Sequence, residues 1–120
     1  MRPREIALRC AKIAHAKKAG AIKVLDVAKL TTVCRYFVVL SGRSEVHVRT
    51  FADAIERYFK KENIYPLHKE GGRPGRWIVL DYGGVVVHMF QKNVREFYKI
   101  EKFWADAKQV SWLKTKRAKK

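Results

Sequence analysis

The apolar residues near the N-terminus recur at the spacing of an α-helix. Four of them follow positions i, i+4, i+7 and i+8 and so lie on one face of a helix. They are Ile6, Cys10, Ile13 and Ala14. The pattern predicts a helix over Glu5–Ala19 that ends at Gly20, since glycine readily adopts the backbone conformation that follows a helix.

Two strands and a second helix are predicted next. Ile22–Val27 and Cys34–Leu40 are rich in β-branched and aromatic residues, which favour strands. Ser44 is then placed to cap a helix whose apolar residues again recur at helical spacing. These residues are Val48, Phe51, Ala52, Ile55 and Phe59. Charged residues occupy the opposite side, so we expect this helix to pack on a sheet with one face.

The stretch from Trp77 to Phe90 predicts a β-hairpin and is the most informative part of the chain. Side chains alternate across a strand, and apolar residues fill both faces of the second hairpin strand. Val85, Val87 and Met89 belong to one face, and Val86, His88 and Phe90 to the other. A strand of this kind normally lies between two layers of structure, so the polar groups among its apolar residues indicate a site or an interface.

Shorter elements flank the hairpin. Tyr65–Lys69 predicts a short strand, and Glu70–Gly75 has the composition of a loop. After the hairpin, Asn93 and Glu96 have the spacing of a capping box and predict a last helix. Its apolar stripe runs through Val94, Phe97, Tyr98 and Trp104.

This order of elements predicts an α/β or α+β fold in which helices flank a mixed sheet. The chain has 120 residues, 48% of them hydrophobic, which suffices for one compact core. We therefore expect a single domain over residues 1–113. Residues 114–120 contain five basic residues and are expected to form a disordered basic arm.

The net charge of +16 indicates a polyanionic partner, because 27 Lys and Arg face only 11 Asp and Glu. The polar face of the first helix carries six basic residues and one acid, and it is either a solvated face or a binding face. Cys10 and Cys34 have no paired spacing and are expected to be buried, reduced and intracellular. No apolar run approaches the roughly 20 residues of a membrane span, so we expect no membrane association.

The sequence offers no convincing catalytic or metal-binding pattern. The four histidines are dispersed, and no paired carboxylates of the form D-x-D follow the Gly42-Arg43-Ser44 turn that could cradle an anion. Asp53 falls within a helix instead. We expect no enzyme, no cofactor, no metal and no small-molecule substrate. His88 is either a core histidine bonded to a backbone carbonyl or a polar contact in an interface.

Aromatic and ionic residues gather toward the end of the chain. They are Trp77, Tyr82, Phe90, Arg95, Tyr98, Glu101 and Trp104. Trp77, Phe90 and Trp104 either fill the contact between helix and sheet or serve an interface. Tyr82 lies in the hairpin turn and is harder to bury, and exposed Tyr, Trp and Arg commonly anchor protein interfaces.

The chain resembles the ribosomal silencing factor (Iojap) family from about Ala21 to Trp112. The matching residues are Asp26, Tyr36-Phe37-Val38-Val39, Ser41-Gly42, Ser44, Glu70-Gly71, Trp77, Leu80-Asp81-Tyr82-Gly83, Val86-Val87-His88-Met89-Phe90, Arg95, Tyr98, Glu101 and Trp104. The combined hairpin and helix signature is long, so chance agreement is improbable. The resemblance implies a nucleotidyltransferase-like core without catalytic carboxylates.

The resemblance also implies a function without catalysis. Members bind ribosomal protein fourteen of the large subunit and block joining of the small subunit, which represses translation. The implied protein-binding residues are Trp77, Asp81, Tyr82, His88, Phe90, Arg95, Tyr98 and Glu101. We expect the arm to bind adjacent rRNA through Lys114, Lys116, Arg117, Lys119 and Lys120. A role in large-subunit assembly and general RNA binding are the alternatives.

Three positions depart from the family pattern. Arg35 and Gly84 each stand where an acid is usual, and Lys99 replaces Asp or Asn. All three changes raise the net charge, which suggests stronger attachment to rRNA. An exposed aromatic face would also favour a homodimer when the partner is absent. The expected compartment is the cytoplasm, with an organellar matrix or stroma as the alternative.

Overall fold

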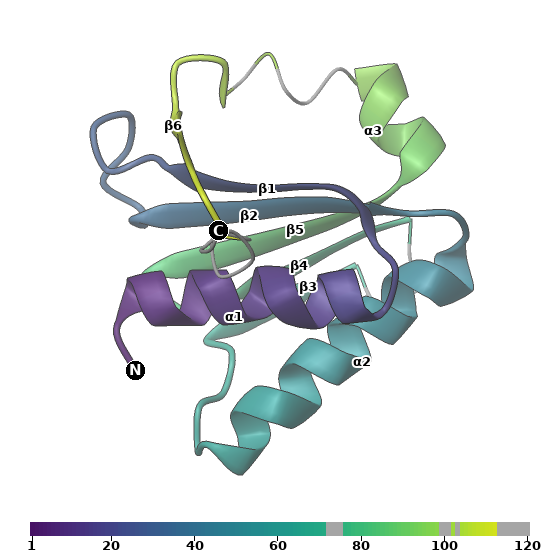
Figure 1. The fold of residues 1–120 in the computed structure, drawn as a ribbon, viewed down its shortest axis with the longest axis horizontal. Helices are drawn as coiled ribbons and strands as arrows, with labels where there is room; N and C mark the ends of the chain where they lie inside the picture. Colours follow the sequence, from purple (N-terminus) through teal and green to yellow (C-terminus); the bar gives the residue numbers. More distant parts are fainter. Residues whose placement is uncertain (72–75, 99–101, 103, 113–120) are drawn as a thin grey trace, which may run out of the picture.

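The computed structural model of this protein describes residues 1–71, 76–98, 102 and 104–112, without the side chains of Phe97 and Tyr98. The helices and strands, in chain order, are α1 (Pro3–Ala16), β1 (Gly20–Asp26), β2 (Tyr36–Gly42), α2 (Glu45–Lys61), β3 (His68–Glu70), β4 (Trp77–Asp81), β5 (Val85–Gln91), α3 (Lys92–Tyr98) and β6 (Lys108–Val110). The strands form one mixed sheet flanked by helices, as the sequence predicts (Figure 1).

The six strands lie in the order β3-β4-β5-β2-β1-β6. β2 and β5 run parallel, and the other neighbouring pairs of described strands are antiparallel. The parallel pair lies at the centre of the sheet and is apolar on both faces, which is typical of strands covered by two layers.

Helices α1 and α2 cover one face of the sheet, which we call the helical face (Figure 1). Their apolar stripes meet the side chains of Val38, Leu40, Val87 and Met89 in the larger core. Gly42 allows α2 to start close to the sheet, because a Cβ atom there would lie 3.0 Å from side-chain atoms of both Phe51 and Val48.

The opposite face of the sheet, which we call the second face, has a smaller core. Its buried residues are Leu25, Val27, Cys34, Phe37, Val39, Val86 and Phe90. Val94 of α3 and Trp104 and Ala107 of the following segment pack against them. Among the described residues, no helix covers the part of this face formed by β3 and β4.

The first helix begins and ends earlier than predicted. Lys18, with φ of 69°, takes the left-handed position expected for Gly20, and the Ala19 N–H donates to the carbonyl oxygen of Ala14 at 3.0 Å. This is the Schellman arrangement that closes a helix with a residue of positive φ. Gly20 is instead the first residue of β1.

The second helix matches its prediction, because the Ser44 hydroxyl accepts a hydrogen bond from the His47 N–H at 3.1 Å. The prediction for α3 was wrong at its start. That helix follows β5 directly at Lys92, so Asn93 lies inside it rather than at its cap. The predicted short strand also moves, to His68–Glu70, and β6 was not predicted at all.

Candidate protein-binding face of the sheet

The hairpin register places most of the predicted site residues of β4 and β5 together on the second face. Trp77 lies opposite Phe90, and Asp81 lies opposite Val86. Between these pairs His88 lies opposite Val79. Side chains of directly paired residues share a face, so one face of the hairpin presents this whole set.

Aromatic rings form a contiguous group on this face, and we call four of them the aromatic cluster: Trp77, His88, Phe90 and Phe37. The Phe37 ring also meets that of Trp104, with ring centroids 4.1 Å apart. The ring centroids of Trp77 and Phe90 are 4.6 Å apart, and those of Phe37 and His88 are 5.0 Å apart. Phe90 is completely buried, whereas Trp77 keeps 38% of its surface exposed. In the cluster, one exposed indole ring therefore lies against rings that are largely buried.

His88 holds the centre of the cluster in its neutral form. Its Nδ1 accepts a hydrogen bond from the Trp77 indole N–H at 3.4 Å, so Nε2 carries the proton. Burial lowers the pKa of His88 to about 4. Its Nε2 is buried and has no hydrogen-bond partner among the described residues. Of the two alternatives for His88, the bond to a backbone carbonyl is absent among the described residues, and the imidazole pairs with the Trp77 indole through Nδ1 instead.

Tyr82 does not belong to this face. It is only 9% exposed and lies in the larger core, where its ring centroid is 5.3 Å from that of Phe59 in α2. Burial raises the pKa of the Tyr82 hydroxyl, with smaller contributions from Cys10 and Glu56. The expectation that Tyr82 resists burial was wrong, because α2 lies under the hairpin turn and covers the ring.

Asp81 and Arg95 support the structure around the face. The Asp81 carboxylate accepts from the Gly83 N–H at 2.8 Å and so fixes the hairpin turn. Arg95 is 4% exposed, and its Nη1 donates to the Ser41 hydroxyl and to the Ala21 carbonyl, both at 2.8 Å. Arg95 therefore joins α3 to β1 and β2.

The remaining predicted contacts fall outside the described part of the molecule. They are the side chain of Tyr98, Glu101, Lys114, Lys116, Arg117, Lys119 and Lys120. Conversely, the structure adds Phe37 and Val79 to the candidate face. Strand alternation gives the signal for Val79, which stands two residues from Trp77, but Phe37 joins the face only through the pairing of β2 with β5.

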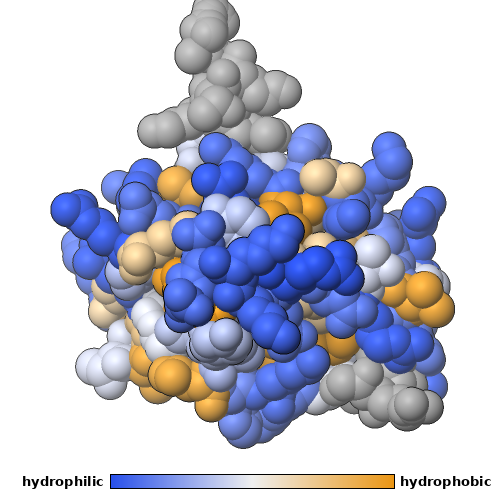
Figure 2. Space-filling view, turned by 90° about the horizontal axis from the view of Figure 1, so that it is seen from below, coloured by the Kyte–Doolittle hydropathy of each residue, from blue (hydrophilic) through white to orange (hydrophobic). Residues whose placement is uncertain are grey.

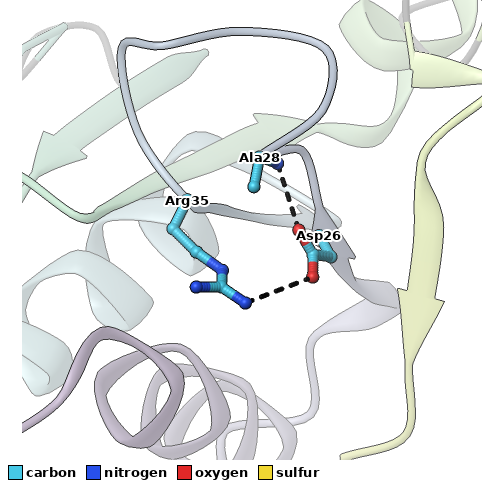
Figure 3. Close-up of polar contacts among 3 residues, drawn as sticks. All are labelled: Asp26, Ala28 and Arg35. Carbon is cyan, nitrogen blue, oxygen red and sulfur yellow. Dashed lines mark hydrogen bonds and ion pairs between the residues drawn. The ribbon is translucent and has the colours of Figure 1, made fainter.

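Arg35 has a structural partner that explains its presence. Its guanidinium lies 4.0 Å from the carboxylate of Asp26, which also accepts from the Ala28 N–H at 3.0 Å (Figure 3). The pair connects the two ends of the loop between β1 and β2. The positive charge at Arg35 is therefore partly neutralised within the protein.

Packing against the N-terminal segment accounts for the glycine at position 84. A Cβ atom at this position would lie 2.7 Å from Cγ of Pro3, at the start of α1. An acidic side chain would require Pro3 to move, so the glycine lets the N-terminus of α1 pack against the hairpin turn. Lys99, the third departure, lies outside the described residues.

The helical side of the molecule differs in chemistry from the second face. Figure 2 shows a predominantly hydrophilic surface with scattered apolar side chains. The exposed basic residues of α1 and its C-terminal end are Arg2, Arg4, Arg9, Lys12, Lys17 and Lys18. Glu5 is the one acid in the helix, so a basic surface and an aromatic surface lie on opposite sides of the sheet.

Cys10 and Cys34 are buried free thiols, as predicted. Burial raises the pKa of both thiols, and for Cys34 the nearby Asp81 adds to an increase to about 11. In the described part of the chain, no group of three or more His, Cys, Asp or Glu side chains could hold a metal ion. None of the described helices is long and apolar enough to cross a membrane.

The second face thus presents an exposed tryptophan, Trp77, that lies against the buried ring of Phe90. The family model described as "Ribosomal silencing factor during starvation" matches residues 1–120. The chain therefore belongs to the ribosomal silencing factor family.

Individual relatives agree with this assignment. The ribosomal silencing factor RsfS of Bacillus subtilis is 36% identical over 91 residues, which cover 76% of this chain and 77% of the relative. The chloroplastic Iojap protein of Arabidopsis thaliana is 33% identical over 87% of this chain and 43% of its own length. A crystal structure of a protein from Chromobacterium violaceum matches with a TM-score of 0.83 at 29% identity, covering 94% and 93% of the two chains.

Proposed function

We propose that this protein binds the large ribosomal subunit through ribosomal protein fourteen and thereby blocks joining of the small subunit. The observation that carries the proposal is the aromatic cluster, in which Trp77 is exposed above the buried Phe90. Tryptophan is among the commonest anchors of protein interfaces, since it supplies a large apolar contact and one polar group. The proposed repression is steric and needs no catalytic residue.

The charge distribution supports a second contact, with rRNA. The net charge is +16, and the exposed basic residues of α1 lie across the sheet from the aromatic cluster. Five of the cations counted in this charge belong to the basic arm at the C-terminus. Protein contact would then give specificity, and phosphate contact would add affinity that falls with salt. The proposed place of action is the cytoplasm, with an organellar matrix or stroma as the alternative.

Co-sedimentation with isolated large and small subunits across a salt series tests the proposal. Trp77→Ala removes the exposed anchor, and we expect binding to the large subunit to weaken about tenfold or more. Tyr65→Ala is the matched control, because Tyr65 is 57% exposed and lies beside α2 rather than on the second face. Wild type and Tyr65→Ala should sediment with the large subunit alone at raised salt.

Equal binding to both subunits that disappears with salt would contradict the proposal and indicate general RNA binding.

Sedimentation of the free protein tests whether the second face also mediates contact between two copies of the chain. We propose that the same face mediates self-association when the ribosomal partner is absent, so Trp77→Ala should reduce any dimer.

A further inference from the structure

Three segments bring positive charge to the end of the sheet at which the central strands β2 and β5 finish. β2 and β5 pair in register as far as Gly42 and Gln91, so Arg43 and Lys92 follow at equivalent positions of two adjacent strands. β1 begins beside them, and Lys18 precedes its first residue by two positions. These side chains are distant in sequence and converge through strand pairing.

The chain leaves the two parallel strands toward opposite faces. β2 leads into α2 on the helical face, and β5 leads into α3 on the second face (Figure 1). Adjacent parallel strands whose following helices diverge leave a crevice outside their carboxyl ends, which is a common position for ligands. A pocket of about 480 Å³ lies at this point, and small-molecule sites occupy roughly 300–1,000 Å³.

The lining of the crevice is strongly basic. Among the described residues it contains the four cations Lys18, Arg43, Lys92 and Arg95 and one carboxylate, that of Glu96, a net charge of +3. Lys18, Arg43 and Lys92 form no ion pair within the described part of the chain. Their charges therefore face the crevice and solvent without a carboxylate partner there.

Two hydrogen-bond arrangements hold the crevice in shape. His47 Nδ1 accepts from the Arg43 N–H at 3.0 Å, and its Nε2 donates to the Lys17 carbonyl oxygen at 2.8 Å. His47 thereby ties the start of α2 to the end of α1, next to two of the lining cations. Arg95 is fixed by its bonds to Ser41 and Ala21 and forms a rigid cationic wall.

We propose that this crevice binds the phosphate group of a phosphorylated small molecule of about nucleotide size. Arg and Lys donors arranged around one point suit a phosphate, and the first turn of the 17-residue helix α2 adds its positive dipole end. The pocket has room for a further group beside the phosphate. This inference does not depend on the ribosomal partner.

Isothermal titration calorimetry with ADP, adenosine and a short single-stranded RNA tests the proposal. Arg43→Gln and Lys92→Gln change exposed residues of the crevice, so both variants should fold, which circular dichroism checks. Lys29→Gln and Lys61→Gln remove the same charge from exposed positions outside the crevice. We expect ADP to bind with one site, adenosine not to bind, and each crevice variant to weaken ADP binding about tenfold.

We expect the control variants Lys29→Gln and Lys61→Gln to bind ADP with the wild-type affinity, which would support the proposed site. The proposal is overturned if the control variants weaken ADP as much as the crevice variants do, since the net charge of +16 would then explain the attraction. Binding of the RNA without binding of ADP would also overturn it, because the crevice would then serve a polynucleotide. Chemical-shift changes at the Gly42 and Arg43 amides on adding ADP would locate the site directly.

Discussion

The indole N–H of Trp77 donates a hydrogen bond to Nδ1 of His88, with 3.4 Å between the two nitrogen atoms. This bond connects the exposed anchor of the aromatic cluster to a partly buried residue on the neighbouring strand. It also requires His88 to be neutral, because a protonated Nδ1 could not accept the indole proton. The orientation of the proposed binding residue therefore depends on the protonation state of its neighbour.

His88 should make the stability of the protein depend on pH. Burial lowers the pKa of His88 from 6.5 to about 4, so the unfolded state binds the proton more readily than the folded state. The free energy of unfolding should fall as the pH falls from about 6.5 to 4, with a loss of about 2–3 kcal/mol near pH 4.5. Urea denaturation at a series of pH values measures this loss.

His88→Gln should remove that part of the pH dependence whatever its own effect on stability. His68→Gln provides the control, since His68 is exposed and pairs with Glu70. An identical pH dependence in wild type and His88→Gln would show that His88 does not titrate between these values.

Tyr82 should respond to substitution as a core residue. Its hydroxyl is buried without a hydrogen-bond partner among the described residues, so Tyr82→Phe should leave stability unchanged or raise it by about 1 kcal/mol. Tyr82→Ala should cost about 3–5 kcal/mol, as large-to-small changes of aromatic core residues do. Thermal or denaturant unfolding measures both. A small loss in Tyr82→Ala would mean that the ring is not packed against Phe59.

The elements with long periodic patterns could be predicted from the sequence. α2 combines five apolar residues at helical spacing with the Ser44 cap, and both signals agree with the structure. The end of α1 could not be predicted, because a lysine at position 18 adopts the left-handed conformation that favours glycine. β6 pairs over only three residues with β1, too few to produce a recognisable alternation.

The candidate face likewise combines features that could be predicted from the sequence with features that could not. Alternation along β5 is enough to place His88 and Phe90 on one side of the sheet, whereas Trp77 joins them through the register of β4 with β5. Their different exposure could not be predicted, because it depends on which part of that side is covered by other segments. The burial of Tyr82 was missed for a related reason, since the turn is covered by α2, which lies more than 20 residues earlier in the chain.

The basic arm makes a prediction about salt dependence. If its five cations contact rRNA phosphates, a chain that ends at Leu113 should bind the large subunit with a weaker dependence on salt. The slope of log affinity against log salt should decrease by about four. Binding measured at several salt concentrations gives this slope for both chains, and an unchanged slope would remove the arm from the rRNA contact.

The measurement that tests the central claim most directly is the joining of isolated large and small subunits in the presence of this protein, followed by gradient sedimentation. Wild type and Tyr65→Ala, added to the large subunit before mixing, should reduce the joined particle. Trp77→Ala at the same concentration should leave joining close to that seen without the protein. Full joining while wild-type protein remains bound to the large subunit would contradict steric occlusion.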